Sequence, residues 1–308
     1  MTNCLVGYTG FVGGNIAAKG TFDGLFNSKN IQDAYGSRPD LLVYAGVRAE
    51  MFLANKYPEK DLAQLDEAFD NMVRIQPKTV VLVSTISVYG ENPAGDEDAV
   101  VNEDVLTAYG KNRLYLERKV AGQFKDCLVV RLPALYGRNI KKNFIHDYIN
   151  VVPSLLKYEK FDELVAMNGR LGDYYERQEN GFYSCRDLSG EERVELKAFF
   201  KSCGFSALNF TDSRSRYQFY NLGYLWGHIQ KALEKGIHRL NITAEPVAVS
   251  ELYEYLEGKP FVNELARPPF VQDLRSKHAE LFGGRNGYFF DRDFVMEDIK
   301  RFVEGERI

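Results

Sequence analysis

Cysteine and histidine are both scarce in this 308-residue chain, which contains four of each. The cysteines show no CxxC spacing, and two of them, Cys4 and Cys127, lie inside apolar runs. The histidines are scattered, without the clustered spacing of metal ligands (His146, His228, His238 and His278). The sequence therefore predicts neither a metal site nor a disulfide framework, and we expect these side chains to be structural or incidental.

The chain also lacks long apolar runs and an excess of positive charge. No stretch approaches the roughly 20 apolar residues that a membrane-spanning helix requires, and no charged leader precedes the first apolar run. The formal net charge is -4 and the isoelectric point is about 5.7, so no basic face is available for unaided binding of nucleic acid. We expect a cytoplasmic protein that binds neither membranes nor nucleic acid and meets small anions with local cations.

Short apolar runs alternate with helical patterns through the first half of the chain. Helical patterns cover about 59–75 and about 107–121, and each ends before a proline or a glycine. Continuous β-branched runs separated by helices predict a parallel sheet that is covered on both faces. We therefore predict an α/β fold with a Rossmann-like, doubly wound parallel sheet over residues 1–150. The predicted strands are "CLVGY" (4–8), "LLVYAG" (41–46), "TVVLVS" (79–84) and "CLVVRL" (127–132).

The second half of the chain has longer polar and tyrosine-rich stretches. Its predicted elements are helices at about 189–202 and 223–235, a strand "HRLNIT", a helix "AVSELYEYLEG" with Ser250 as its N-cap, and a terminal helix "FVMEDIKRFVEG". No internal repeat and no low-complexity linker separates the two halves. We predict that residues 151–308 form a smaller α/β substrate lobe and cap, interwoven with the first domain.

A glycine loop stands at the start of the chain, in "CLVGYTGFVGGNIAAK". Gly7 permits a tight turn, Gly10 lets backbone N–H groups approach a pyrophosphate, and Gly13 allows the helix to pack closely on the strand. With 26 glycines in the chain the triplet alone is not specific, but its place between strand and helix is. We predict a dinucleotide site, completed by Phe11, Val12, Ala45 and Gly46; the alternative is a βα turn without a ligand.

In dinucleotide-binding folds, a side chain about 20 residues after the glycine loop contacts the adenosine ribose. After the next plausible strand, the sequence offers Asn27, Ser28 and Lys29, which are donors, and no carboxylate. Donors suit a 2′-phosphate, so NADP is preferred to NAD. Asp23 would reverse this preference if the strand ended earlier. The stretch is also short, which predicts a missing or truncated strand.

Five blocks of sequence carry a resemblance to a known family. They are "GYTGFVG", "DLLVYAGV", "VVLVSTISVYG", "AYGKNRLYLE" and "VVRLPALYG". In this order and at these distances they resemble the extended short-chain dehydrogenases/reductases, in particular the NAD(P)-dependent nucleotide-sugar epimerases, dehydratases and reductases of carbohydrate metabolism. The resemblance covers about residues 3–145 well and about 215–257 more faintly.

The resemblance implies a catalytic role for Tyr109 and Thr85. Tyr109 would exchange a proton with a sugar hydroxyl or ketone while hydride passes to or from the nicotinamide, and Thr85 would hold the same oxygen. Arg113 stands where the family has lysine. It can lower the pKa of the Tyr109 phenol, ordinarily about 10, and can bind the nicotinamide ribose. It cannot join a proton relay, because a guanidinium keeps its proton.

The same resemblance indicates the substrate side. Ile86 and Ser87 follow Thr85, where the dehydratases of the family carry an acid, so we expect an epimerase or a reductase. Residues expected near the substrate, a nucleotide sugar, are Thr85, Ser87, Lys142, Asn143 and Arg216. For Lys142 and Arg216 the alternative is a solvated surface cation.

Three further questions stay open on the sequence. The stretch from Lys157 to Ser215 is longer than its counterpart in the family, and it is either a cap over the sugar pocket or a partner-binding surface. The family suggests a homodimer through the helices at 59–75 and 107–121, which requires apolar outward stripes; core packing would explain the same residues. Arg113 and the enlarged cap also fit a non-catalytic NAD(P)-binding sensor or scaffold.

Overall fold

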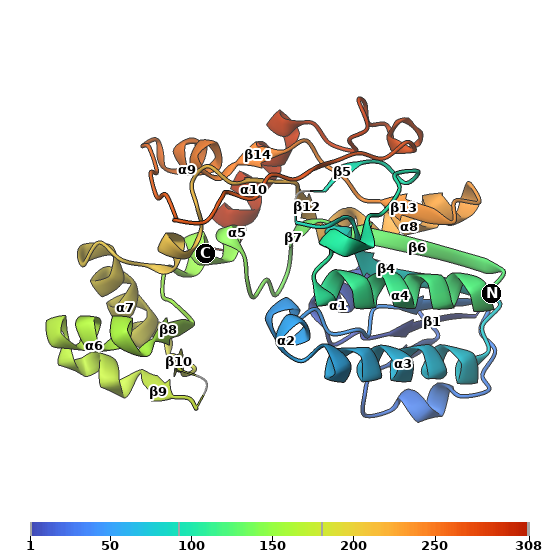
Figure 1. Cartoon of the computed structure of the whole chain (residues 1–308), viewed down its shortest axis with the longest axis horizontal. Coiled ribbons are helices and arrows are strands. Elements are labelled where there is room, and N and C mark those ends of the chain that lie inside the picture. The colour runs from blue at the N-terminus through green and yellow to red at the C-terminus, as the bar shows by residue number, and fades with distance from the viewer. Residues whose placement is uncertain (1, 92, 180, 307–308) are drawn as a thin grey trace.

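The computed structural model describes residues 2–91, 93–179 and 181–306. Its centre is a six-stranded parallel sheet with the strand order β13-β6-β4-β3-β1-β2 (Figure 1). All four predicted strands of the first half and the predicted strand at 238–243 belong to it. The strands are β1 (Asn3–Val6), β2 (Gly24–Phe26), β3 (Leu41–Tyr44), β4 (Thr79–Thr85), β6 (Asp126–Leu132) and β13 (Arg239–Asn241).

Helices cover both faces of the sheet, as alternating residues of its strands require. In β6, Leu128 and Val130 pack with α1 (Phe11–Ala17) and α8 (Leu225–Glu234), whereas Cys127 and Val129 face the side of α3 (Pro58–Ile75) and α4 (Ala108–Gln123). Because α8 and β13 come from the second half of the chain, the two halves are interwoven. The predicted α/β class with a doubly wound sheet is confirmed.

The segment between β2 and β3 is shortened, as predicted. β2 has three residues at the sheet edge, and a 3-10 helix (Ile31–Ala34) leads to β3. Asp23 directly precedes β2, where its carboxylate accepts a hydrogen bond from the Asn3 backbone N–H at 2.7 Å. Asp23 therefore lies at the amino end of the strand, away from the edge where parallel strands bind ligands.

The second lobe packs around its own apolar cluster. Short strands pair in it, β7 (Ala134–Tyr136) with β12 (Phe219–Asn221) and β11 (Arg216–Tyr217) with β14 (Val247–Ala248). The prediction of Ser250 as an N-cap was wrong: the helix begins at Val249, with Ala248 as its N-cap, and the Ser250 backbone N–H bonds the Ser213 carbonyl. The remaining elements of the lobe and its surroundings are α2 (Met51–Lys56), β5 (Ala94–Gly95), α5 (Phe144–Asn150), α9 (Val249–Glu257), β15 (Asp273–Leu274) and α10 (Arg292–Glu306).

The long stretch after α5 forms a small unit with a separate core. Its antiparallel sheet has the order β8 (Leu155–Lys157), β10 (Phe182–Cys185), β9 (Tyr175–Arg177), flanked by α6 (Tyr158–Met167) and α7 (Gly190–Ser202). Tyr174 and Tyr175 are buried in its core. The unit begins and ends at one place, where the Ala207 N–H donates to the Val151 carbonyl at 2.8 Å. Figure 1 shows these elements (yellow-green) apart from the helices that flank the central sheet.

The outward faces of α3 and α4 are polar. The apolar residues of α3 pack into the core beneath the sheet (Leu65, Ala68, Met72 and Ile75). Core packing therefore accounts for these residues. The exposed positions of the two helices are mostly charged or amide side chains. The large hydrophobic side chains that these helices expose are Val73 and Tyr115, and the homodimer through them stays a prediction. Across the described residues, no helix is long and apolar enough to cross a membrane.

Candidate active site

The glycine loop packs against the end of β3 so closely that two of its residues have no room for a side chain. Gly7 has a φ of +90°, and a Cβ there would lie 2.6 Å from the Ala45 carbonyl. A Cβ on Gly13 would lie 2.2 Å from the Gly7 carbonyl oxygen. The tight turn thus brings the first turn of α1 next to Ala45 and Gly46, at the carboxyl edge of the sheet.

The exposed residues of this loop suit the phosphate groups of a dinucleotide. Thr9 and Gly10 are exposed, and α1 starts directly after them. The backbone N–H groups of a first helical turn have no intrahelical acceptors and are free for an anion. Phe11 and Val12 pack their side chains on the core beneath the loop, so their contacts with a ligand would be through the backbone.

The turn after β2 offers donors and no carboxylate. The Asn27 side-chain carbonyl accepts from the Lys29 backbone N–H at 2.8 Å, and the Asn30 side-chain carbonyl accepts from the Asn27 N–H at 2.8 Å. Asn27 is therefore used to shape the turn. Ser28 and Lys29 are exposed on it, where they can reach a ligand on the carboxyl side of β2.

Tyr109, Thr85 and Arg113 come together where β4 ends and α4 begins. Thr107 caps α4 by accepting from the Gly110 N–H at 3.3 Å, and a Cβ on Gly110 would lie 2.5 Å from the Ser87 carbonyl. This close packing brings Tyr109 near Thr85, which lowers the pKa of the Tyr109 hydroxyl. The Arg113 guanidinium stacks on the Tyr109 ring, 4.4 Å from its centroid. The Ser87 hydroxyl lies 3.2 Å from that of Thr85.

Asp61, which the sequence did not single out, holds Arg113 in place. The guanidinium donates to both oxygens of the Asp61 carboxylate, at 2.9 and 3.1 Å, and to the Arg48 carbonyl at 2.6 Å. Asn112 donates to the same carboxylate at 2.9 Å, and Arg113 is 4% exposed. The guanidinium is committed to protein partners, so contact with a ribose would require it to exchange one of them.

Burial raises the pKa of the Tyr109 hydroxyl above its ordinary value. Arg113 and Thr85 act in the opposite direction, and the Asp61 charge adds to the increase. Arg113 thus contributes as predicted, but the net pKa is raised, because burial outweighs a cation that Asp61 neutralises. Tyr109 is held protonated at neutral pH, which suits it to donate a proton.

No family model and no curated protein matches this sequence. Solved structures do resemble it along their whole length. The dTDP-4-dehydrorhamnose reductase from Yersinia enterocolitica is 11% identical, with 100% of both chains covered and a TM-score of 0.63. UDP-glucose 4-epimerase from Thermotoga maritima is 14% identical, covering 99% of this chain and 98% of its own, with a TM-score of 0.62. RMD from Pseudomonas aeruginosa, complexed with NADPH, is 14% identical, with 100% and 99% coverage and a TM-score of 0.60.

The chain shares its fold with these nucleotide-sugar enzymes. In this fold Thr85 ends the fourth strand and Tyr109 opens the helix that follows, on the edge of the sheet that carries the glycine loop. The residues that the resemblance assigned to cofactor and catalysis therefore share one edge. The residues assigned to the substrate are distributed differently.

Both polar groups of the Asn143 side chain are bonded to the backbone. Its carbonyl caps α5 by accepting from the Ile145 N–H at 3.0 Å, and its amide donates to the Leu135 carbonyl at 2.7 Å. Lys142 donates to the Ala49 carbonyl at 2.6 Å, across from the loop after β3. Arg216 is exposed beside a hollow of about 270 Å³ that Arg292 and two carboxylates also line.

Asn15 is a second residue that sequence reasoning missed. It is buried, and its amide donates to the Phe11 carbonyl at 2.8 Å and to the Arg138 carbonyl at 2.9 Å. Asn15 thus joins the helix of the glycine loop to the loop that leads into the second lobe of this fold. A polar residue on the inner face of a short helix was the signal that could have indicated it.

Proposed function

We propose that this protein is an NADP(H)-dependent reductase of a nucleotide-linked keto sugar. The observation that carries the proposal is the buried Tyr109, which lies with Thr85 and Arg113 at the edge of the sheet that carries the glycine loop. Burial raises the pKa of its hydroxyl and so favours the phenol over the tyrosinate. Epimerisation begins with oxidation of an alcohol and needs tyrosinate as a base, whereas ketone reduction needs a phenol as an acid. The solved structures with this fold include both reductases and epimerases, so the choice of reduction rests on Tyr109.

Bound NADPH would supply the hydride that reaches the carbonyl carbon of the sugar. Thr85 would donate a hydrogen bond to the ketone oxygen and so orient it. Tyr109 would then donate its proton to that oxygen, which completes the alcohol, and would be reprotonated from solvent. Arg113, stacked on the ring at 4.4 Å, would stabilise the transient tyrosinate by its charge.

The phosphates of the nucleotide would be met from the second lobe. Arg216 is exposed in β11, and its fork of donors suits phosphate oxygens. Lys142 bonds a backbone carbonyl and would have to release it to bind substrate. Asn143 would contribute through its backbone, since its side chain is occupied.

A non-catalytic NAD(P)-binding protein is a second candidate, and one observation favours it. Arg113 is tied to Asp61 and to the Arg48 carbonyl, whereas the family's lysine contacts the nicotinamide ribose. Such a protein would bind the cofactor and turn over no substrate.

Titration of the purified protein with NADPH and separately with NADH, followed by nicotinamide fluorescence, tests the cofactor site. Oxidation of NADPH is then measured with dTDP-linked and UDP-linked 4-keto sugars. Binding with turnover supports the reductase, and binding without turnover across such a panel supports the second candidate. Failure to bind either nucleotide contradicts both.

The preference for NADP depends on Lys29. Lys29→Gln removes the exposed cation at the end of β2 and is expected to weaken NADPH binding about tenfold, because a hydrogen bond to a charged group contributes roughly 1.5–3 kcal/mol. NADH binding should be unchanged. Lys19→Gln, an exposed lysine just after α1, is the matched control. An equal loss for NADPH and NADH would contradict the role of Lys29.

Asp61 is expected to set the pH range of the reaction. Asp61→Asn removes a charge that raises the pKa of Tyr109 and leaves Arg113 uncompensated, so that pKa falls. An acid is active while protonated; the alkaline limb of the kcat profile should therefore move to lower pH. Loss of one partner of a buried pair should also cost roughly 3–5 kcal/mol of stability.

The control for this variant is Asp66→Asn. Asp66 lies one turn further along α3 and pairs with Lys119 at the surface, where an ion pair contributes at most about 1 kcal/mol. If the alkaline limb of the kcat profile stayed at the same pH in Asp61→Asn, Asp61 would not affect the pKa of Tyr109.

A further inference from the structure

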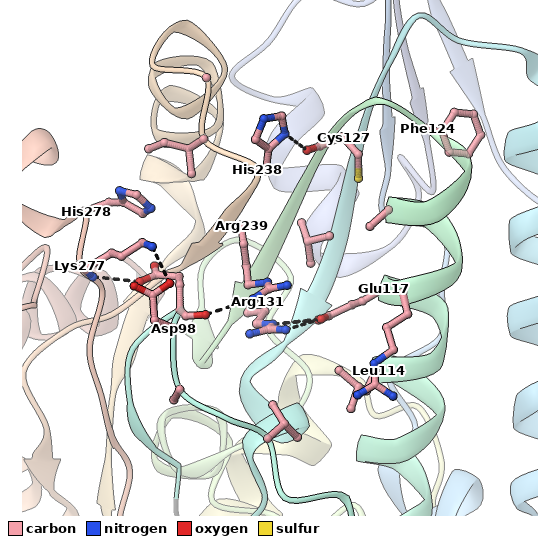
Figure 2. A pocket seen from close by; sticks show the side chains of 18 of the residues that line it. Asp98, Leu114, Glu117, Phe124, Cys127, Arg131, His238, Arg239, Lys277 and His278 are labelled. Carbon is pink, nitrogen blue, oxygen red and sulfur yellow. Dashed lines mark hydrogen bonds and ion pairs between the residues drawn. The ribbon is translucent and has the colours of Figure 1, made fainter.

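A groove of about 1040 Å³ lies between α4 and the strands β6 and β13, on the face of the sheet that α4 covers (Figure 2). It exists because α8, the helix before β13, packs on the opposite face with α1. The groove is lined by α4 from Leu114 onward and by β6 from Cys127 to Arg131, and Tyr109 does not line it. None of the residues assigned above to cofactor, catalysis or substrate lines it.

The groove gathers cations in a chain whose net charge is negative. Of its carboxylates, Glu117 pairs with Arg131 at 2.5 Å and Asp98 pairs with Lys277 at 2.6 Å. The cations that line it are Arg118, Lys125, Arg131, Lys235, Arg239 and Lys277, together with His238 and His278. Among the described residues, no carboxylate pairs with Lys125, Lys235 or Arg239, and the Arg239 guanidinium donates to the Glu97 backbone carbonyl at 3.1 Å.

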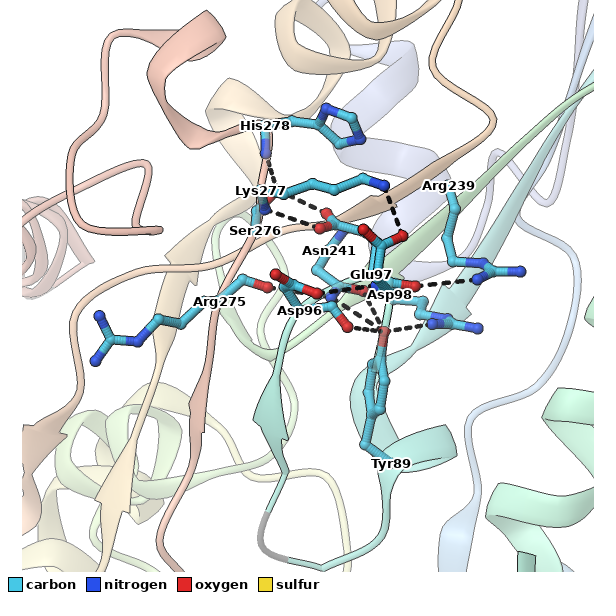
Figure 3. Close-up of polar contacts among 11 residues, drawn as sticks. Tyr89, Asp96, Glu97, Asp98, Arg239, Asn241, Arg275, Ser276, Lys277 and His278 are labelled. Carbon is cyan, nitrogen blue, oxygen red and sulfur yellow. Dashed lines mark hydrogen bonds and ion pairs between the residues drawn. The ribbon is translucent and has the colours of Figure 1, made fainter. Parts of the chain in front are cut away.

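A buried carboxylate holds one wall of the groove in place (Figure 3). Glu97 is 2% exposed. It accepts from the Asn241 N–H at 2.8 Å, the Ser276 hydroxyl at 2.6 Å and the Lys277 N–H at 2.9 Å. Segments from three parts of the chain are thereby fixed to one another, so the cations on them are positioned before any ligand arrives.

The floor of the groove argues for a small ligand. Its inner apolar side chains are buried (Leu114, Phe124, Cys127, Val129 and Ile237), and two further apolar lining residues, Val100 and Leu281, are exposed. The volume is close to the upper end of the roughly 300–1,000 Å³ of small-molecule sites. What the groove offers is unpaired positive charge.

We propose that this groove is a second ligand site, which binds a small molecule carrying phosphate groups. Lys125, Lys235 and Arg239 would bind the phosphate oxygens, since these cations have no competing carboxylate. The site is independent of the cofactor site and of the proposed reductase activity.

Calorimetric titration with inorganic pyrophosphate and with ADP tests the proposal. The variant is Lys125→Gln combined with Lys235→Gln, whose exposed side chains make no hydrogen bond or ion pair with the described residues. Each lost ionic contact should weaken binding about tenfold. The control combines Lys201→Gln with Lys259→Gln, two exposed lysines that do not line the groove.

The expected result is binding to the wild-type protein and to the control, with a large loss in the groove variant, also when NADPH is present in excess. Tighter binding of ADP than of pyrophosphate would indicate a nucleotide, and equal binding would indicate recognition of the phosphates alone. Equal affinities of wild type and groove variant, complete competition by NADPH, or no binding to the wild type would overturn the proposal. None of these outcomes depends on turnover of a sugar, so this test is separate from the test of the proposed reductase activity.

Discussion

Tyr109→Phe is expected to lower kcat for ketone reduction by about 10²–10⁴-fold, the contribution of a positioned general acid. The substitution removes the hydroxyl, the group that would donate the proton, and leaves the ring, on which Arg113 stacks at 4.4 Å. The affinity for NADPH should stay within a factor of about three, because one side-chain contact at most is lost. Steady-state kinetics and nicotinamide fluorescence measure the two quantities separately.

Tyr115→Phe is the matched control for this experiment. Tyr115 lies on the same helix, and its hydroxyl donates to Asp66 at 2.8 Å on the outer surface. It should have nearly wild-type kinetics. If Tyr109→Phe turned over a genuine substrate at the wild-type rate, another group would have to be the acid.

Gly13→Ala is expected to prevent cofactor binding, with NADPH affinity falling by about 100-fold or more. Its methyl group would meet the Gly7 carbonyl oxygen at 2.2 Å and the carbonyl carbon at 2.6 Å, both backbone atoms that cannot rotate away. The glycine loop must therefore separate from α1. Overpacking of this kind also costs typically 1–3 kcal/mol of stability, so the melting temperature should fall with the affinity.

Gly227→Ala provides the comparison in a second helix. Gly227 lies in α8, is exposed, and has no atom within 4 Å of its Cβ position. Alanine there should raise the stability by about 0.5–1 kcal/mol and leave NADPH binding unchanged. Normal cofactor binding by Gly13→Ala would show that the loop does not need its present close packing to hold the dinucleotide.

The framework of the fold was predictable because its signals are local. The apolar runs at 79–84 and 127–132 became β4 and β6, and the helical patterns at 59–75 and 107–121 became α3 and α4 within one or two residues at each end. Each depends on a periodicity that a short window contains. The start of the helix near Ser250 depends on a backbone contact with Ser213. The local preference of serine for N-caps therefore gave the wrong capping residue there.

The site was predictable in part, for a related reason. Thr85 and Tyr109 mark a strand end and a helix start, which sequence patterns locate. Asp61 lies 52 residues from Arg113, and an acid in the first turn of a helix is ordinary by itself. Asn143 carried a local signal, since asparagine before a helix is a common N-cap, but the family resemblance assigned it to the substrate instead.

The cationic groove had no signal in the sequence. Its residues come from α4, β6, β13 and the segment near Lys277, and each alone is an ordinary surface lysine or arginine. What creates the groove is the choice of sheet face by α8, which depends on the packing of Trp226 and Ile229 with the α1 side of the core. Such a choice is decided by tertiary packing and not by the pattern of a single helix.

The segment between Val151 and Ala207 has the form of an inserted unit, because a backbone hydrogen bond joins its two ends. Both ends of the segment leave the host lobe at one point, and its apolar cluster is built from its own residues. Evolution, or an engineer, could therefore lengthen, exchange or delete it and rejoin the chain across a single short link. No strand of the central sheet would be interrupted, so this part of the molecule can diversify while the edge that carries Tyr109 and the glycine loop stays as it is.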